Sequence, residues 1–176
     1  MKNNLLFDFS VNRKNKTIHI KRAFDVPATL VWQAWTDPKL LDKWCAPKPY
    51  RTETKTMEFR EGGFWHYALV SPSGGKHWSR YDYKKIDKKK SITEWRVFSD
   101  ENGLISPDYQ PTVCTITFNE QDGQTLVTME EKYGSAEMFK KMASDSHKKG
   151  FSAHLRNLEE LLFTLKDNYN ETDIII

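Results

Sequence analysis

The stretch that decides the fold is residues 22–44, RAFDVPATLVWQAWTDPKLLDKW. Pro27 stands where a first helical residue belongs, because proline lacks the N–H that is unpaired there, and apolar residues then recur at helical spacing. Asp37 and Pro38 repeat the arrangement, with Asp37 as an N-cap, and the second apolar face runs to Trp44. The stretch therefore predicts two short helices in succession.

Strand patterns lie on both sides of these helices. Residues 17–24 alternate before them, and residues 50–132 keep a period of two that is interrupted by turn residues. This pattern predicts six further strands in hairpin succession, hence an antiparallel meander. If the loop over residues 119–124 closes symmetrically, Cys114 lies opposite Met129, and an apolar face lies opposite a threonine face.

The C-terminal part returns to helical spacing. One unbroken helix over residues 136–166 would span about 46 Å at ~1.5 Å per residue, which is longer than a domain of this size is wide. We therefore expect a break near residues 144–146, with one short and one long helix. Together the elements predict an α+β domain over residues 16–166, in which a curved antiparallel sheet of about seven strands wraps around the long C-terminal helix.

The ends of the chain carry weaker patterns. Residues 1–15 are polar and are expected to form a lead-in, although apolar residues alternate there as in a short edge strand. These alternating residues are Leu5, Phe7 and Phe9. Residues 167–176 are expected to form a C-terminal tail, and no role is assigned to its last residues, Ile174-Ile175-Ile176.

Composition narrows the class of protein. The chain has 176 residues, 13% of them aromatic and 29% charged, and a formal net charge of +3. This aromatic content excludes a disordered chain, and no apolar run approaches the ~18 residues of a membrane helix. The two cysteines, Cys45 and Cys114, form no CxxC motif and suit a reducing compartment. We therefore expect a cytoplasmic protein with neither a membrane nor a nucleic acid as its partner.

Five blocks carry a family resemblance. They are RAFDVPA (22–28), VWQAWTDP (31–38), LDKW (41–44), EGGFW (61–65) and GF (150–151). With these blocks the chain resembles, over about residues 16–165, the START-like helix-grip superfamily (SRPBCC) and, within it, the activator of heat-shock-protein-90 ATPase homologue 1-like family. The resemblance implies a helix-grip fold. The chain departs from the family pattern at Cys45-Ala46 and Phe151, where a pocket's mouth and wall are expected, so no ligand specificity is implied.

Aromatic residues and histidines are the candidates for lining a cavity between sheet and helix. Tryptophan and tyrosine combine a large apolar area with one polar atom, which suits an apolar ligand oriented by few hydrogen bonds. Core packing explains any single aromatic residue better than a pocket role does. A histidine at the edge of the core, bonded to the backbone, is likewise favoured over a pocket histidine. The predicted wall residues are Trp44, Trp65, Tyr67, Trp95, Met142, His147, Phe151 and His154.

No pattern identifies a reaction. The sequence has no HExxH, GxSxG or phosphate-loop motif, and we predict neither a metal site nor a cofactor. Adjacent Glu130 and Glu131 point to opposite faces of their strand and so do not form an acid and base pair.

The first hypothesis is a protein that binds a small apolar or aromatic molecule without catalysis. A second is an interaction module that regulates the heat-shock-protein-90 ATPase, as the family name suggests, and a homodimer is a further possible partnership. A third is an enzyme of the cyclase or hydrolase type that uses the cavity. That alternative requires a buried ionisable pair there, for instance His66 or His147 beside a carboxylate or a tyrosine.

Overall fold

The computed structural model describes residues 6–169, so Leu5 and Ile174–Ile176 lie outside the described residues. The elements, in chain order, are β1 (Phe7–Asn12), β2 (Thr17–Phe24), α1 (Ala28–Thr36), α2 (Pro38–Trp44), β3 (Arg51–Met57), β4 (Phe64–Val70), β5 (Lys76–Asp87), β6 (Ser91–Phe98), β7 (Thr112–Gln121), β8 (Gln124–Tyr133), α3 (Ala136–Met142) and α4 (Asp145–Asp167).

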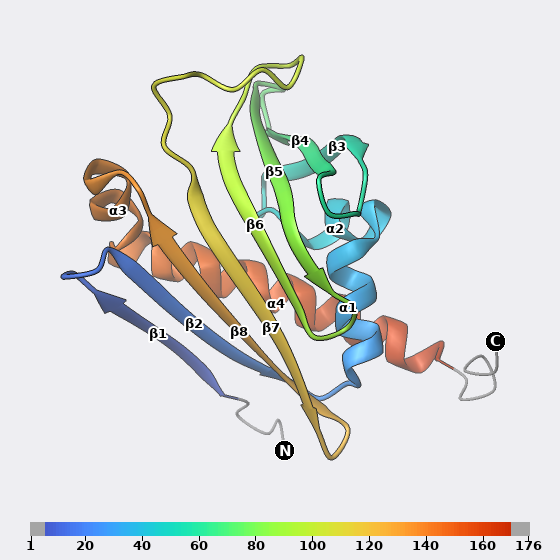
Figure 1. Cartoon of the computed structure of the whole chain (residues 1–176). Helices are drawn as coiled ribbons and strands as arrows, with labels where there is room; N and C mark the ends of the chain where they lie inside the picture. Colours follow the sequence, from blue (N-terminus) through green and yellow to red (C-terminus); the bar gives the residue numbers. More distant parts are fainter. Residues whose placement is uncertain (1–5, 170–176) are drawn as a thin grey trace.

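The strands form one antiparallel sheet of eight, in the order β1-β2-β8-β7-β6-β5-β4-β3. Consecutive strands pair throughout, except that β2 pairs with β8. The long helix α4 lies across one face of this curved sheet, and α1 and α2 lie beside it (Figure 1). The α+β helix-grip architecture is confirmed, and the strand beyond the expected seven is β1, at the alternation of Phe7 and Phe9.

The two short helices after β2 form as the sequence predicts, with one shift at the start. Pro27 is the N-cap of α1, which begins one residue later than expected. Asp37 caps α2, because its carboxylate accepts a hydrogen bond from the Lys39 N–H at 2.8 Å, and Pro38 is the first residue of that helix. These caps place both helices against the sheet.

The predicted break in the C-terminal helix is confirmed. α3 ends at Met142, and α4 begins after Ser144, whose hydroxyl accepts a hydrogen bond from the His147 N–H at 3.2 Å. A serine at this position satisfies one of the N–H groups left free at a helix start. The break frees α4 to run across the sheet in its own direction (Figure 1).

The expected register of the β7–β8 hairpin was wrong by two residues. The turn consists only of Asp122 and Gly123, both with positive φ, at 54° and 77°. A two-residue turn of this kind is typical of tight hairpins. Cys114 therefore lies opposite Glu131 and not Met129. A shift of two keeps each residue on its expected face, but it changes which residues are neighbours across the strands.

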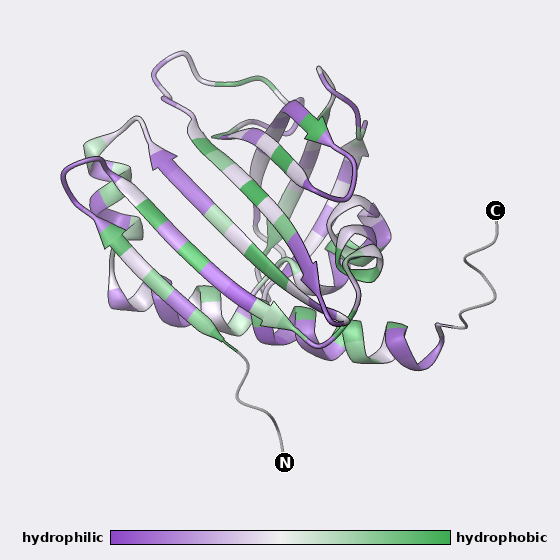
Figure 2. Ribbon diagram, turned by 60° about the horizontal axis from the view of Figure 1, so that its bottom comes forward, coloured by the Kyte–Doolittle hydropathy of each residue, from purple (hydrophilic) through white to green (hydrophobic). Residues whose placement is uncertain are grey.

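The core lies where α1, α2 and α4 meet the inner face of the sheet. The Trp35 ring packs 4.7 Å from Trp44 and 5.5 Å from Phe118, between ring centroids. The Trp44 indole N–H donates to the Ala34 carbonyl at 2.9 Å, so its polar atom is paired although the residue is buried. Figure 2 shows hydrophobic and hydrophilic residues alternating along the strands, as a sheet with one covered face requires.

Candidate functional site: a cavity between the sheet and the last helices

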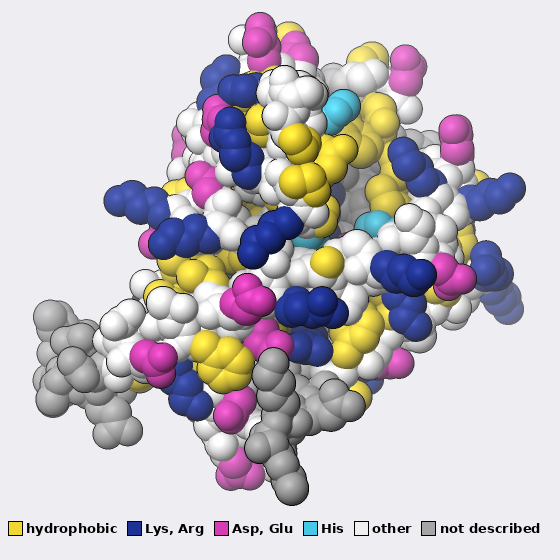
Figure 3. Space-filling view, turned by 180° about the vertical axis from the view of Figure 1, so that it is seen from behind, with side chains coloured by type: hydrophobic (Ala, Val, Ile, Leu, Met, Phe, Trp, Pro, Cys, Tyr) yellow, Lys and Arg dark blue, Asp and Glu magenta, His cyan; other side chains and the backbone are white. Residues whose placement is uncertain are grey.

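A cavity of about 1070 Å³ remains between the inner face of the sheet and helices α3 and α4. Strands β4 to β8 supply one wall, and α4 supplies the opposite wall with His147, Phe151 and His154. Figure 3 shows a hollow on this side of the molecule, with hydrophobic and histidine side chains around it. Sheet and helix therefore do not fill the space between them.

Seven of the eight predicted wall residues line this cavity. They are Trp44, Trp65, Tyr67, Met142, His147, Phe151 and His154.

Trp95 is the exception, and its placement in the wall was wrong. Its side chain lies on the outer face of β6, where 43% of the residue is exposed. The Lys84 ammonium lies 4.2 Å from its ring centroid on that outer face. Because side chains alternate along a strand, the outward position of Trp95 turns its neighbours Glu94 and Arg96 toward the cavity.

One end of the cavity is aromatic and carries few polar atoms. Trp65 stacks on Tyr67 with ring centroids 4.0 Å apart, and Tyr81 meets both rings edge to face. The Tyr67 hydroxyl donates to the Tyr81 hydroxyl at 2.8 Å, and the Trp65 indole N–H donates to Thr54 at 2.9 Å. These pairings fix the orientation of the rings.

The floor of the cavity is charged because of the strand register. Across β5 to β8, Tyr83, Glu94, Cys114 and Glu131 lie directly opposite one another in one row. The neighbouring row, two residues along each strand, contains Tyr81, Arg96, Thr112 and Tyr133. Both rows lie on the same face of the sheet, so three charged side chains meet in the middle of it.

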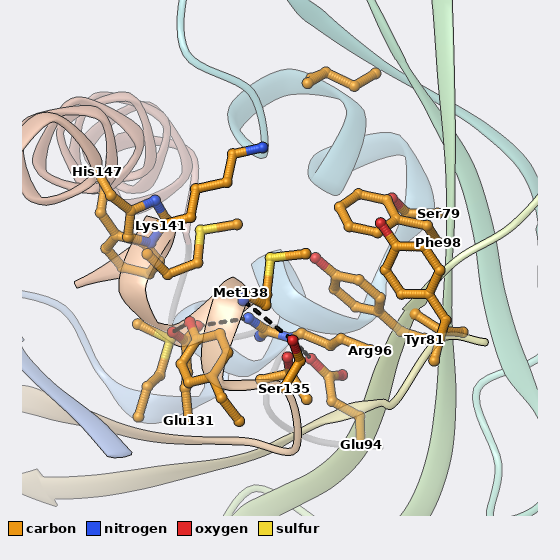
Figure 4. A pocket seen from close by; sticks show the side chains of 18 of the residues that line it. Ser79, Tyr81, Glu94, Arg96, Phe98, Glu131, Ser135, Met138, Lys141 and His147 are labelled. Carbon is orange, nitrogen blue, oxygen red and sulfur yellow. Dashed lines mark hydrogen bonds and ion pairs between the residues drawn. The ribbon is translucent and has the colours of Figure 1, made fainter. Parts of the chain in front are cut away.

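Arg96 links the two carboxylates of this cluster. Its Nε donates to Glu94 Oε1 at 2.8 Å, and its Nη1 donates to Glu131 Oε1 at 2.9 Å. The Tyr133 hydroxyl donates to the other Glu131 oxygen, Oε2, at 2.6 Å. The guanidinium also lies 4.7 Å from the Tyr81 ring centroid. Figure 4 shows Arg96 between Glu94 and Glu131, with His147 on the side of the helices.

Burial strongly affects the ionisation of this cluster. The Glu94 and Glu131 side chains are only 5% and 4% exposed. Loss of water raises the pKa of Glu94, and the guanidinium of Arg96 opposes that rise. Burial also raises the pKa of the nearby Cys45 thiol to about 12, so this cysteine is a thiol at neutral pH and not a nucleophilic thiolate.

The helical wall presents two unpaired imidazoles. The Nε2 atoms of His147 and His154 are buried and have no hydrogen-bond partner among the described residues. The alternative of a histidine bonded to the backbone is therefore not supported at these atoms. Burial lowers the pKa of His147, and burial together with His147 lowers the pKa of His154 to about 4. Both imidazoles are therefore neutral at pH 7, and their rings form part of the helical wall of the cavity.

Other chemical groups lie apart from the cavity or are unsuited to catalysis. His66 does not line it, and its Nε2 contacts the Asp100 carbonyl at 3.0 Å, so His66 is not part of an ionisable pair there. Cys45 and Cys114 are both free thiols. Within residues 6–169, no three His, Cys, Asp or Glu side chains come together as a metal site requires. In the same range no helix is long and apolar enough to cross a membrane.

The sequence profile of the family described as Activator of Hsp90 ATPase homolog 1-like protein matches residues 25–162. The chain belongs to this family. No curated protein matches the chain. The family assignment agrees with the blocks of sequence that carried the resemblance. It supports a helix-grip fold of the ligand-binding type.

Solved structures share the fold of this family member. The crystal structure of protein Ms6760 from Mycobacterium smegmatis has 26% identity and a TM-score of 0.79, covering 90% of this chain and 96% of that one. A solution structure of a protein from Arthrobacter aurescens has 23% identity and a TM-score of 0.81, covering 89% and 91%. The crystal structure of CalU16 from Micromonospora echinospora has 18% identity and a TM-score of 0.59, covering 91% and 87%. The last two show the fold alone.

Sequence reasoning missed the charged floor of the cavity. Glu94 and Arg96 flank Trp95, and assigning that tryptophan to the inner face sent both charges outward. The sequence places Glu131 correctly on the face opposite to Glu130. Without the true hairpin register, however, its neighbour across the strands, Cys114, is not identified. The Asp122-Gly123 pair was the signal that fixes this register.

Proposed function

We propose that this family member binds a small, largely apolar molecule in the cavity between the sheet and α4. The observation that carries the proposal is the unfilled volume of about 1070 Å³ among aromatic side chains. Ligand pockets are typically about 300–1,000 Å³, mostly apolar, with a few polar groups that fix orientation. The Arg96 cluster supplies such groups at the floor of the cavity.

A cytoplasmic location is part of this proposal. Cys45 and Cys114 are unpaired, as is usual for thiols in a reducing compartment. The ligand would then be a molecule of the cell interior.

Binding can be tested with the neutral fluorescent probe N-phenyl-1-naphthylamine, whose emission rises in apolar surroundings. We expect the natural chain to bind one probe molecule, counted by native mass spectrometry. Ser79 and Met142 line the cavity, and among the described residues the Ser79 hydroxyl has no hydrogen-bond partner. Ser79→Phe and Met142→Trp therefore fill space without removing a hydrogen bond, and each should weaken binding about tenfold or more.

Trp95→Ala is the matched control, because it removes a large aromatic ring from the outer face of the same sheet. It should leave probe affinity unchanged. All variants are checked for an intact fold by circular dichroism and thermal unfolding. Absence of probe binding by the natural chain, or equal affinity in all four proteins, would contradict the proposal.

The two alternatives from the sequence stay predictions. Regulation of the Hsp90 ATPase rests on the family description, and its test is whether the purified chain stimulates a purified chaperone ATPase. An enzyme requires a buried ionisable pair in the cavity, and Glu94 beside Arg96 is a pair of this kind. Turnover of a bound molecule, followed by mass spectrometry with Glu94→Gln as the inactive control, would favour the enzyme.

A further inference from the structure

The charged floor of the cavity narrows the class of ligand. We propose that the bound molecule carries a basic nitrogen, held as a cation against the open oxygen of Glu94, with its apolar body between the aromatic walls. This inference rests on the proposed function, since it concerns the same cavity.

The buried cluster has more acidic than basic side chains. The buried cluster contains two carboxylates, Glu94 and Glu131, but only one guanidinium, Arg96. The two imidazoles on the helical wall are neutral at pH 7 and add no positive charge. Burial disfavours the charged form of Glu94 and raises its pKa, so a cation beside it would favour the carboxylate form. Lys16 and Lys141 also line the cavity, but among the described residues neither forms an ion pair with Glu94 or Glu131. A cationic ligand at Glu94 would supply the second positive charge of the cluster.

The hydrogen bonds of the cluster identify the open position. Glu131 uses both oxygens, one for Arg96 and one for Tyr133. Glu94 uses Oε1 for Arg96, while its Oε2 accepts no hydrogen bond from any described residue. Glu94 lies in the cavity lining, so this oxygen is an acceptor available to a ligand N–H. An ammonium group donates such a bond and supplies the missing charge together.

The surroundings of Glu94 suit a cation attached to an apolar body. Tyr83 lies directly opposite Glu94 on β5, and Tyr81 lies one row away with Trp65 edge to face against it. Aromatic faces attract cations, and they attract them more strongly when water is excluded. The Arg96 guanidinium already makes such a contact with Tyr81, at 4.7 Å. The rings therefore serve both the apolar part and the charged part of the ligand.

An acidic ligand fits this floor poorly. A carboxylate at the floor would meet Arg96 as its cation, and Glu94 and Glu131 already accept hydrogen bonds from Arg96 at 2.8 and 2.9 Å. Like charges at such distances repel strongly away from water. The cluster thus selects against acids and favours amines over neutral molecules of the same shape.

The test compares three naphthalenes of matched shape: 2-naphthylmethylamine as the cation, 2-naphthylmethanol as the neutral molecule and 2-naphthoic acid as the anion. Affinities are measured by calorimetry at neutral pH. We expect the amine to bind about tenfold more tightly than the alcohol, and the acid to bind most weakly. Glu94→Gln should remove the preference for the amine over the alcohol, because the amide carries no charge.

Glu130→Gln is the matched control, because it removes the same charge from the neighbour of Glu131 on the outer face, where the Glu130 side chain is 54% exposed. It should leave the order of the three affinities unchanged. The order in the natural chain tests the proposal even if Glu94→Gln does not fold. Equal or tighter binding of the alcohol or the acid overturns the preference for a basic nitrogen and leaves the proposed function standing. Absence of binding by all three overturns both.

Discussion

Strand β6 reverses the usual arrangement of a sheet, because charged residues lie on its buried inner face and a large aromatic residue lies on its outer face. On the inner face, Glu94 and Arg96 are buried in the cavity floor. On the outer face, the tryptophan between them is 43% exposed. Charged residues are almost never fully buried unless they are paired, and large aromatic residues are usually inside. The reversal teaches that the alternation along the strand, and not the polarity of the side chains, decides which face each of these three residues takes.

Aromatic residues on the outer face lie against cationic side chains. Trp95 has the Lys84 ammonium 4.2 Å from its ring centroid, and Phe64 has the Arg80 guanidinium at 4.3 Å. Such contacts contribute about 0.5–1 kcal/mol each at exposed sites. The inner cluster is instead held by hydrogen bonds between buried charged side chains. Removing a partner should therefore cost far more inside than outside.

Arg96→Met should have the largest effect. The change leaves Glu94 and Glu131 buried together without a counter-charge, which typically costs about 3–5 kcal/mol of the free energy of unfolding. Urea denaturation monitored by circular dichroism measures the loss. The matched outer change is Arg80→Met, whose side chain is 28% exposed and pairs with Asp82. It should cost less, about 1–2 kcal/mol, because water reaches this pair more readily. Equal losses for the two variants would remove the contrast between the faces.

His154, on the helical wall of the cavity, should make the stability of the fold depend on pH. Burial and the nearby His147 lower the pKa of His154 from 6.5 to about 4. Between these values the unfolded chain binds a proton at this residue and the folded chain does not, so stability falls as pH drops from about 6.5 to about 4. At 1.36 kcal/mol per pKa unit, the group accounts for about 3 kcal/mol of that loss.

His154→Gln isolates this contribution from the other titrating groups. The difference between the unfolding free energies of the natural chain and the variant should change by about 3 kcal/mol across that pH window and stay constant above it. Urea denaturation at a series of pH values measures it. Parallel curves for the two proteins would show that His154 takes up its proton equally in the folded and unfolded chains.

The fold followed from local signals that need no knowledge of distant neighbours. Asp37 before Pro38 marks a helix start by itself, and Ser144 marks the break between α3 and α4. The site required non-local information. The face of Trp95 depends on the pairing of β6 with two other strands, and the neighbour of Glu131 depends on a hairpin turn of two residues. A register error of one residue places a side chain on the wrong face of the sheet. A register error of two residues keeps the face but assigns the wrong neighbour on the next strand.

Trp95→Ala should have the smallest effect of the three changes. The residue is 43% exposed and its ring contacts the ammonium of Lys84, an exposed residue, so we expect a loss of below about 1 kcal/mol. Trp65→Ala provides the comparison inside the cavity, because Trp65 is 2% exposed and stacks on Tyr67. Its removal should cost about 3–5 kcal/mol. Both losses come from the same denaturation measurements. A large loss for Trp95→Ala would mean that the outer face of β6 supports the fold as much as the inner face does, and its tryptophan would then need a partner beyond Lys84.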